Sequence, residues 1–333
     1  MTSVSIGDLA QSLLLRRANG AAKRELAGLT AELSTGQAPD AGRHLNGMVS
    51  SLLSIDTAAG QARVFGQSAR QAAARAAAMQ AALATIDQTA GEAARNLLSA
   101  AASNDAAGLT AAGSRALSGL GQVVAALNAR FAGASLFSGQ AADTPPLVPA
   151  DQILRMARDA VGSATTPDEV VSRLQDWMAS PSGFAAAAYR GADTPVEVPV
   201  GPDETVRLDL LASDKELHGT IAGLVMGALA ADAQFAAGRG GAAGLARVAG
   251  QTLLSQAEVR SGQSARLGII ESRLESAAAR HSAEESALGL ARNDLLSVDL
   301  YTTASRLSET ETRLQAIHAL TARLSRLSLT DYL

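Results

Sequence analysis

The last forty residues of the chain carry apolar side chains at helical spacing. From Leu300 onward, steps of three, four and seven residues separate most of them, and arginine and glutamate fill much of the remaining surface. Such spacing places the apolar residues on one face of an amphipathic helix. The apolar residues that make up this face and the ending are Leu300, Ala304, Leu307, Leu314, Ile317, Leu320, Leu324, Leu327, Leu329, Tyr332 and Leu333. We expect this face to dock on the N-terminal segment, on another copy or on a different protein, and favour an intermolecular role over packing within one subunit.

The N-terminal segment has a comparable pattern. Its apolar positions are Ile6, Leu9, Leu13, Leu26, Leu29 and Leu33, and charged residues lie between them. The helical signal is interrupted around Asn19-Gly20. Two amphipathic segments on either side of a long middle predict an antiparallel helix pair that brings the chain ends together.

Proline divides the middle of the chain. Of nine prolines, Pro39 stands alone near the front and the other eight lie between Pro145 and Pro202. Because helix interiors exclude proline, long helices are predicted for residues 49–131 and from residue 245 to the end. A helix break is predicted at Ser103-Asn104-Asp105, which offers good N-cap residues.

The proline-containing centre predicts a different, mixed structure. Asp151–Val161 and Pro167–Met178 read as short helices, the second capped by Thr166. Val196–Val200 and Thr205–Leu210 alternate apolar and polar residues across a four-residue loop, which predicts a β-hairpin with Pro199 at an edge position. The expected fold is therefore mainly α: a long antiparallel helical rod with a small mixed α/β insertion.

Composition narrows the class of function. The 333 residues contain only 3% aromatics, so a core of Ala, Leu and Val in slender helix packing is expected. The net charge of −4 argues against a nucleic-acid partner. Leu217–Ala231, the longest stretch without Asp, Glu, Lys or Arg, is shorter than the roughly 20 residues of a membrane span. The chain has no cysteine, and its first residues do not resemble a cleavable signal peptide.

Candidate chemistry is sparse. His281 with Glu284 and Glu285 could hold a metal weakly, but a polar layer on the helix seam is the favoured interpretation. The glycines of 238–241 with Gly244 lack the residues of a phosphate loop and predict a flexible link. We expect no enzyme activity, no metal and no cofactor.

Several segments resemble motifs of the flagellin superfamily. Leu33-Ser34-Thr35-Gly36 is similar to the motif after the superfamily's first helix, and residues 127–139, which end in Leu136-Phe137-Ser138-Gly139, to the one that closes its ascending helix. Residues 265–275, 294–299 and 304–316 resemble the "RLG…NRLE" and "DLSDVEDVD" stretches and the final helix. The resemblance covers most of the chain outside about 140–235, although the paired Asp-Asp-Pro usual after Gly36 is missing.

The ending points to one branch of the superfamily. Residues 322–333, Ala-Arg-Leu-Ser-Arg-Leu-Ser-Leu-Thr-Asp-Tyr-Leu, resemble the close of the hook-associated protein 3 family, the hook–filament junction proteins. The resemblance implies terminal coiled-coil segments (1–45 and 299–333), a helical rod domain (46–139 and 236–298) and a solvent-facing insertion (140–235). Short amphipathic ends bury too little area alone, so we expect them to be disordered in the monomer.

The resemblance also implies a location and partners. Such a protein is exported through the flagellar type III apparatus to the extracellular flagellum and forms a ring with copies of itself. It assembles on the first hook-associated junction protein, offers a surface to flagellin, and is guarded beforehand by an export chaperone on its C-terminal helix. Two alternatives remain open at this point: flagellin itself, and a cytosolic helical scaffold or signalling bundle.

Overall fold

The prediction of a mainly α-helical fold is confirmed by the computed structural model, which describes residues 6–232 and 239–330. The longer helices are α1 (Ile6–Thr35), α3 (Ser50–Ser103), α4 (Ala106–Leu127), α5 (Ala150–Val161), α6 (Pro167–Ala179), α8 (Lys215–Leu229), α10 (Arg239–Ser255), α11 (Ala257–Leu296) and α12 (Leu300–Thr330). The shorter ones are α2 (Ala41–His44) and α7 (Phe184–Ala188). Strands β1 (Arg130–Phe131) with β2 (Ala134–Ser135), and β3 (Val196–Pro199) with β4 (Thr205–Leu208), form two separate antiparallel pairs.

The chain divides into two compact units. One contains Met1–Arg63 and Ser282–Leu333, and the other contains Val64–His281. Helices α3 and α11 contribute residues to both units. The three-part division expected from the sequence stays a prediction.

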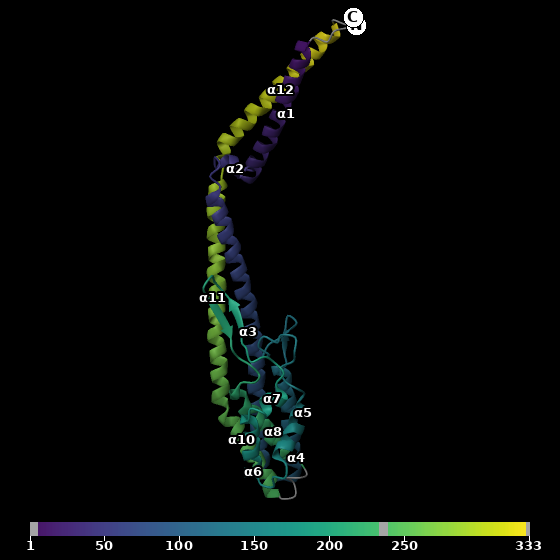
Figure 1. Cartoon of the computed structure of the whole chain (residues 1–333), viewed down its shortest axis with the longest axis vertical. Coiled ribbons are helices and arrows are strands. Elements are labelled where there is room, and N and C mark those ends of the chain that lie inside the picture. Colours follow the sequence, from purple (N-terminus) through teal and green to yellow (C-terminus); the bar gives the residue numbers. More distant parts are fainter. Residues whose placement is uncertain (1–5, 233–238, 331–333) are drawn as a thin grey trace. The chain divides into compact units, whose positions relative to one another are not determined.

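The core of the unit 64–281 is built around α8. Figure 1 shows α4, α5, α6 and α10 gathered around this helix. Every residue from Thr220 to Leu229 is buried, and the charge-free stretch of the sequence corresponds to this central helix. Among the described residues, no helix has the length and apolar character needed to cross a membrane.

Glycines let the neighbouring helices approach α8 closely. Gly223 and Gly227 lie one turn apart on α8. A Cβ atom on Gly223 would lie 2.7 Å from the Leu253 side chain of α10, and one on Gly227 would lie 2.7 Å from Leu97 of α3. Because the side chains of other helices occupy the space that a Cβ would need, these glycines are required by packing rather than by a turn.

A buried arginine joins three helices of the same unit. Arg260 on α11 is 4% exposed. Its Nε donates to Asp87 Oδ1 of α3 at 2.8 Å, and its Nη1 donates to the Leu253 carbonyl of α10 at 3.0 Å. The buried charge is therefore paired, which is the condition under which burying a guanidinium is tolerated.

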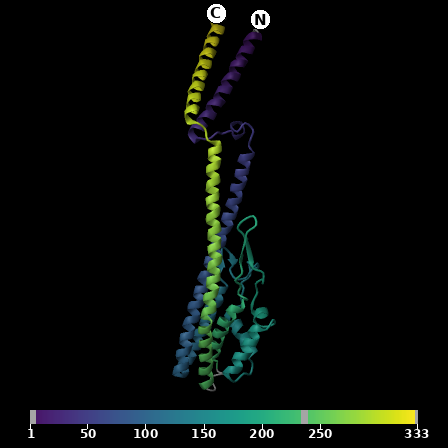
Figure 2. The same cartoon turned by 90° about the vertical axis from the view of Figure 1, so that its left-hand side faces the viewer.

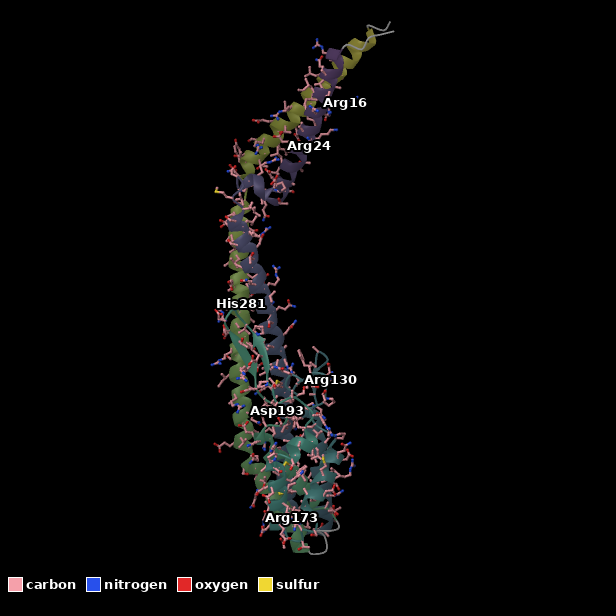
Figure 3. All side chains as sticks on the ribbon, viewed as in Figure 1. Arg16, Arg24, Arg130, Arg173, Asp193 and His281 are labelled. Carbon is pink, nitrogen blue, oxygen red and sulfur yellow. The ribbon has the colours of Figure 1, made fainter. Side chains whose placement is uncertain are left out.

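The predicted hairpin forms and packs on α11. Val196 pairs with Leu208 and Pro199 with Thr205. The carbonyl oxygen of Val200 accepts a hydrogen bond from Nε2 of His281 at 2.7 Å. Figure 3 labels His281. The centroid of its ring lies 5.7 Å from the centroid of the Phe65 ring.

His281 thus belongs to a buried contact between the hairpin and α11. Arg280 next to it forms an ion pair of 2.5 Å with Glu204 of the hairpin loop. Among the described residues, no group of three or more His, Asp or Glu side chains is placed to hold a metal ion.

Helix caps predicted from the sequence are confirmed. Helix α3 ends at Ser103, and the carboxylate of Asp105 accepts from the Gly108 amide to cap α4. Helix α6 begins with Pro167 after the N-cap Thr166, whose side chain accepts from Glu169. These local signals work because they satisfy amides that a helix leaves unpaired at its start.

Two helix boundaries differ from the prediction. Helix α1 runs without a break through Asn19-Gly20, so the expected interruption is wrong. Helix α10 begins at Arg239, so Gly240, Gly241 and Gly244 are helical rather than a flexible link, while Gly238 lies outside the described residues. The helix penalty of glycine, about 1 kcal/mol, is outweighed by tertiary packing. A Cβ at Gly244, for example, would lie 3.1 Å from Pro167 of α6.

His218 on α8 is a half-buried histidine with a shifted pKa. Its Nε2 lies 3.1 Å from the Ser213 carbonyl oxygen, and its ring packs edge-on against Phe184 with centroids 5.1 Å apart. Burial lowers the pKa of His218 below its ordinary value, and the nearby Lys215 lowers it further, while the hydrogen bond to Ser213 acts in the opposite direction.

We expect His218 to make the unit 64–281 sensitive to acid. Because its folded-state pKa is lowered, the unfolded chain takes up the proton first, and stability is lost as the pH falls through the unfolded value of about 6.5. His218→Gln should reduce the drop in melting temperature between pH 7 and pH 5, followed by circular dichroism. The exposed His44→Gln is the control, and an equal effect of both variants would contradict the prediction.

Candidate assembly surface

The two terminal helices form an antiparallel pair, as predicted. Figures 1 and 2 show α1 and α12 side by side, with the beginning of α1 and the end of α12 at the same end of the pair. An ion pair of 3.4 Å between Arg313 Nη1 and Glu25 Oε2 links the two helices and indicates how they are aligned.

Helix α12 contributes a regular row of residues to this pair. Thr303, Thr310 and Ile317 are buried, with 4%, 1% and 9% of their surface exposed, and Leu307 and Leu314 between them are half-buried. The five positions are separated by alternating steps of four and three residues. This is the heptad spacing of a coiled coil.

Helix α1 has the same spacing. Leu15, Asn19, Ala22, Leu26 and Leu29 follow one another by steps of four and three. Ala22 and Leu29 are each 3% exposed, and the other three are half-buried. We call these five residues and the five of α12 the terminal seam. Its spacing and burial are those expected of two helices that pack side by side as a coiled coil.

The structure places the predicted assembly residues in three groups. Those in the terminal seam are Leu26, Leu29, Leu307, Leu314 and Ile317. Those exposed on the pair are Leu13, Leu33, Leu300 and Leu320, between 38% and 52% exposed. The side chains of Ile6, Leu9, Leu324, Leu327 and Leu329 lie outside the described part of the structure, as do the residues Tyr332 and Leu333. Their role in assembly stays a prediction.

Five residues of the terminal seam were not among the predicted assembly residues. Thr303, Thr310 and Asn19 are polar, Ala22 is small, and Leu15 is a leucine for which Leu13 was chosen instead. The signal that could have found them is the heptad itself, because counting back from Ile317 by sevens reaches both threonines.

A short backbone ladder follows α1 and precedes α12. The amide of Ala38 donates to the Leu296 carbonyl at 2.9 Å, and the amide of Val298 donates to the Gly36 carbonyl at 3.1 Å. Gly36 has a φ of +71°, which favours glycine at the end of α1. The ladder therefore fixes where the chain leaves α1 and enters α12.

The first turn of α12 is capped by Asp299. Its carboxylate accepts from the Tyr301 amide at 2.9 Å and from Thr302 Oγ1 at 2.7 Å. The hydrogen bonds from Thr302 and Tyr301 hold the pKa of Asp299 below its ordinary value. The helix thus begins with an ionised cap, which suits the positive end of its dipole.

Helices α3 and α11 are joined by ion pairs in the same unit. Arg63 Nε lies 2.8 Å from Glu285 Oε1, and Arg292 Nε lies 2.9 Å from Asp56 Oδ1. All four side chains are at least one-third exposed, so each pair contributes at most about 1 kcal/mol. These ion pairs therefore add little to the free energy of unfolding, and their main effect is on how α3 and α11 are aligned.

Exposed apolar side chains gather on this unit. Of fourteen strongly exposed large apolar residues among the described side chains, ten belong to it, although it contains about a third of the chain. The ten are Leu13, Leu14, Leu33, Met48, Val49, Leu53, Leu290, Leu300, Tyr301 and Leu320. This unit therefore carries most of the large exposed apolar side chains among the described residues, which makes it the candidate assembly surface.

Comparisons with known proteins agree with this arrangement. Residues 249–333, which include α11 and α12, match the family of the bacterial flagellin C-terminal helical region. A comparison with curated protein sequences finds no match. The fold is similar to the solved structure of a protein from Vibrio parahaemolyticus that is assigned as a flagellar hook-associated protein, with 13% identity and a TM-score of 0.50 over 73% of this chain and 95% of that one. Over residues 249–333, the family match confirms the resemblance to the flagellin superfamily that the sequence motifs first indicated.

Proposed function

We propose that the protein is a hook–filament junction protein, a structural component of the bacterial flagellum that joins the hook side to the flagellin filament and seeds filament growth. The observation that carries the proposal is the pair of terminal helices, of which α12 exposes Leu300 and Leu320 and lies in the region that matches the flagellin family. The fold shared with the Vibrio parahaemolyticus protein supports the hook-associated role. The chemistry required is packing rather than catalysis.

The sequence of the ending favours the junction role. Residues 322–333 resemble the close of the hook-associated protein 3 family rather than the tail typical of flagellins. In this role, copies of the chain form a ring on the first hook-associated junction protein and present a second surface to flagellin. Before that, an export chaperone covers α12 until the chain enters the type III apparatus, through which it reaches the cell exterior.

Flagellin is the second candidate, because the matched region is that of the flagellin family. The two candidates differ in a property that is easily measured. A flagellin polymerises by itself onto a seed of its own filament, whereas a junction protein stops after one ring. Purified protein that grows into long filaments would favour flagellin.

Deletion of the gene tests the proposal directly. We expect cells that carry hooks without filaments and that shed flagellin into the medium, because flagellin then lacks the surface on which it polymerises. Electron microscopy of the cells and blotting of the medium measure both effects. Restoring the gene should restore filaments, and normal filaments in the deletion strain would refute the junction role.

A further inference from the structure

The loop between α2 and α3 contains an Asn-Gly pair in a tight turn. Asn46 and Gly47 have φ values of +52° and +81°, and the Met48 amide donates to the Leu45 carbonyl at 2.9 Å. These values fit a type I′ turn, in which both central residues need a positive φ and for which Asn-Gly is a preferred pair. The turn therefore explains why these two residues follow each other here.

An asparagine followed by glycine is open to a spontaneous reaction. The backbone nitrogen of the glycine attacks the side-chain amide carbon of the asparagine, and the new C–N bond closes a five-membered succinimide ring. The side-chain nitrogen leaves as ammonia and takes the proton of the backbone amide. Water then adds to either ring carbonyl and opens the ring to aspartate or isoaspartate. Glycine favours the closure because it has no Cβ to obstruct it and its backbone is the most adaptable.

The structure leaves the Asn46 side chain accessible and unrestrained. Asn46 and Gly47 are exposed, and no described residue forms a hydrogen bond with the Asn46 side chain. The side chain of Asn128, by contrast, is held by two hydrogen bonds to the Leu147 backbone. The Gly47 amide donates to the Gly42 carbonyl of α2 at 2.8 Å, but α2 has only four residues. A helix this short opens easily, which frees the attacking nitrogen.

Two other asparagines each have only one of the two features. Asn19 also precedes a glycine, but both residues lie inside the continuous helix α1 and are half-buried. Asn104 is exposed and has a φ of +49°, but it precedes Asp105, whose carboxylate caps α4. Ring closure at Asn19 therefore requires local unfolding of α1, and ring closure at Asn104 meets a Cβ on the next residue.

We propose that Asn46 is a modification site, at which spontaneous deamidation through a succinimide with Gly47 yields aspartate and isoaspartate. Either product places a new carboxylate close in sequence to Arg43 and His44. Isoaspartate also lengthens the backbone by one carbon atom, which a two-residue turn does not accommodate, so the loop before α3 rearranges. The inference rests on the local structure and does not depend on the flagellar role.

Peptide mapping of the full-length protein tests the proposal, because trypsin places the three asparagines in different peptides. These are 18–23 for Asn19, 44–63 for Asn46 and 96–115 for Asn104. The folded protein is kept at physiological temperature in mildly alkaline buffer made with H₂¹⁸O, and each sample is then digested in ordinary water. Mass spectrometry measures the ¹⁸O-labelled product at each site, so that deamidation during digestion is not counted. Methylation by an isoaspartyl methyltransferase identifies the isoaspartate.

The expected result is that Asn46 gains label about tenfold or more faster than Asn19 and Asn104, because only Asn46 combines a following glycine with an open turn. In denaturant, Asn19 and Asn46 should react at similar rates and Asn104 should stay slower. Gly47→Ala should slow the reaction at Asn46, whereas the matched control Gly20→Ala should leave it unchanged. Equal labelling of the three sites in the folded protein, or an unchanged rate at Asn46 in Gly47→Ala, would overturn the proposal.

Discussion

Replacing Leu314 and Ile317 together by aspartate is expected to abolish filament formation while the helices of residues 64–281 stay folded. Both residues belong to the terminal seam, and Ile317 is 9% exposed. Placing two carboxylates there loses apolar contacts and desolvates charge, at a cost of about 3–5 kcal/mol or more. Most of the stability of such a helix comes from its packing, so the pair should open.

The matched control for this double variant is Gln315→Asp with His318→Asp. These residues have the same spacing one position further along α12, and both are exposed. The control adds the same charges outside the seam and should form filaments. Electron microscopy of cells and thermal unfolding of the purified chains measure assembly and folding separately. Full filaments from the seam variant, or their loss in the control, would contradict the assignment of the seam.

The apolar spacing of the sequence predicted some of the residues buried between α1 and α12, but not all of them. Leu307, Leu314 and Ile317 were expected on one face, and the structure brings them together. Thr303 and Thr310 could not be found by counting apolar residues, although both are almost fully buried. Burial of a threonine depends on which face the partner helix covers, and that is a property of the pair rather than of either sequence segment.

Local signals predicted two helix caps and the hairpin correctly. The caps at Asp105 and Thr166 and the hairpin loop after Val200 act through bonds to residues close in sequence. The start of α10 was predicted wrongly because glycine favours loops locally. There, the packing of residues such as the buried Ala242 and Leu245 decides the structure.

The glycines of α8 are the least predictable part of the core. Nothing near Gly227 in the sequence shows that Leu97 and Ala116, more than a hundred residues earlier, fill the space beside it. From sequence alone, the stretch is only apolar and free of charge. Its role as the central helix follows from contacts with α4 and α10, which arise only after the chain has folded.

Gly227→Ala is therefore expected to destabilise the unit 64–281, although alanine is the better helix former. The new Cβ would lie 2.7 Å from Leu97 Cδ1 and 2.9 Å from Ala116 Cβ, closer than real Cβ contacts. Overpacking of this kind costs about 1–3 kcal/mol and lowers the melting temperature by several degrees. Gly121→Ala is the control, because no atom lies within 4 Å of its new Cβ, and it should gain about 0.5–1 kcal/mol. Denaturant unfolding measures the change in the free energy of unfolding for each variant, expected as a loss for Gly227→Ala and a gain for Gly121→Ala. A gain in both would mean that α8 does not pack as tightly as the structure shows.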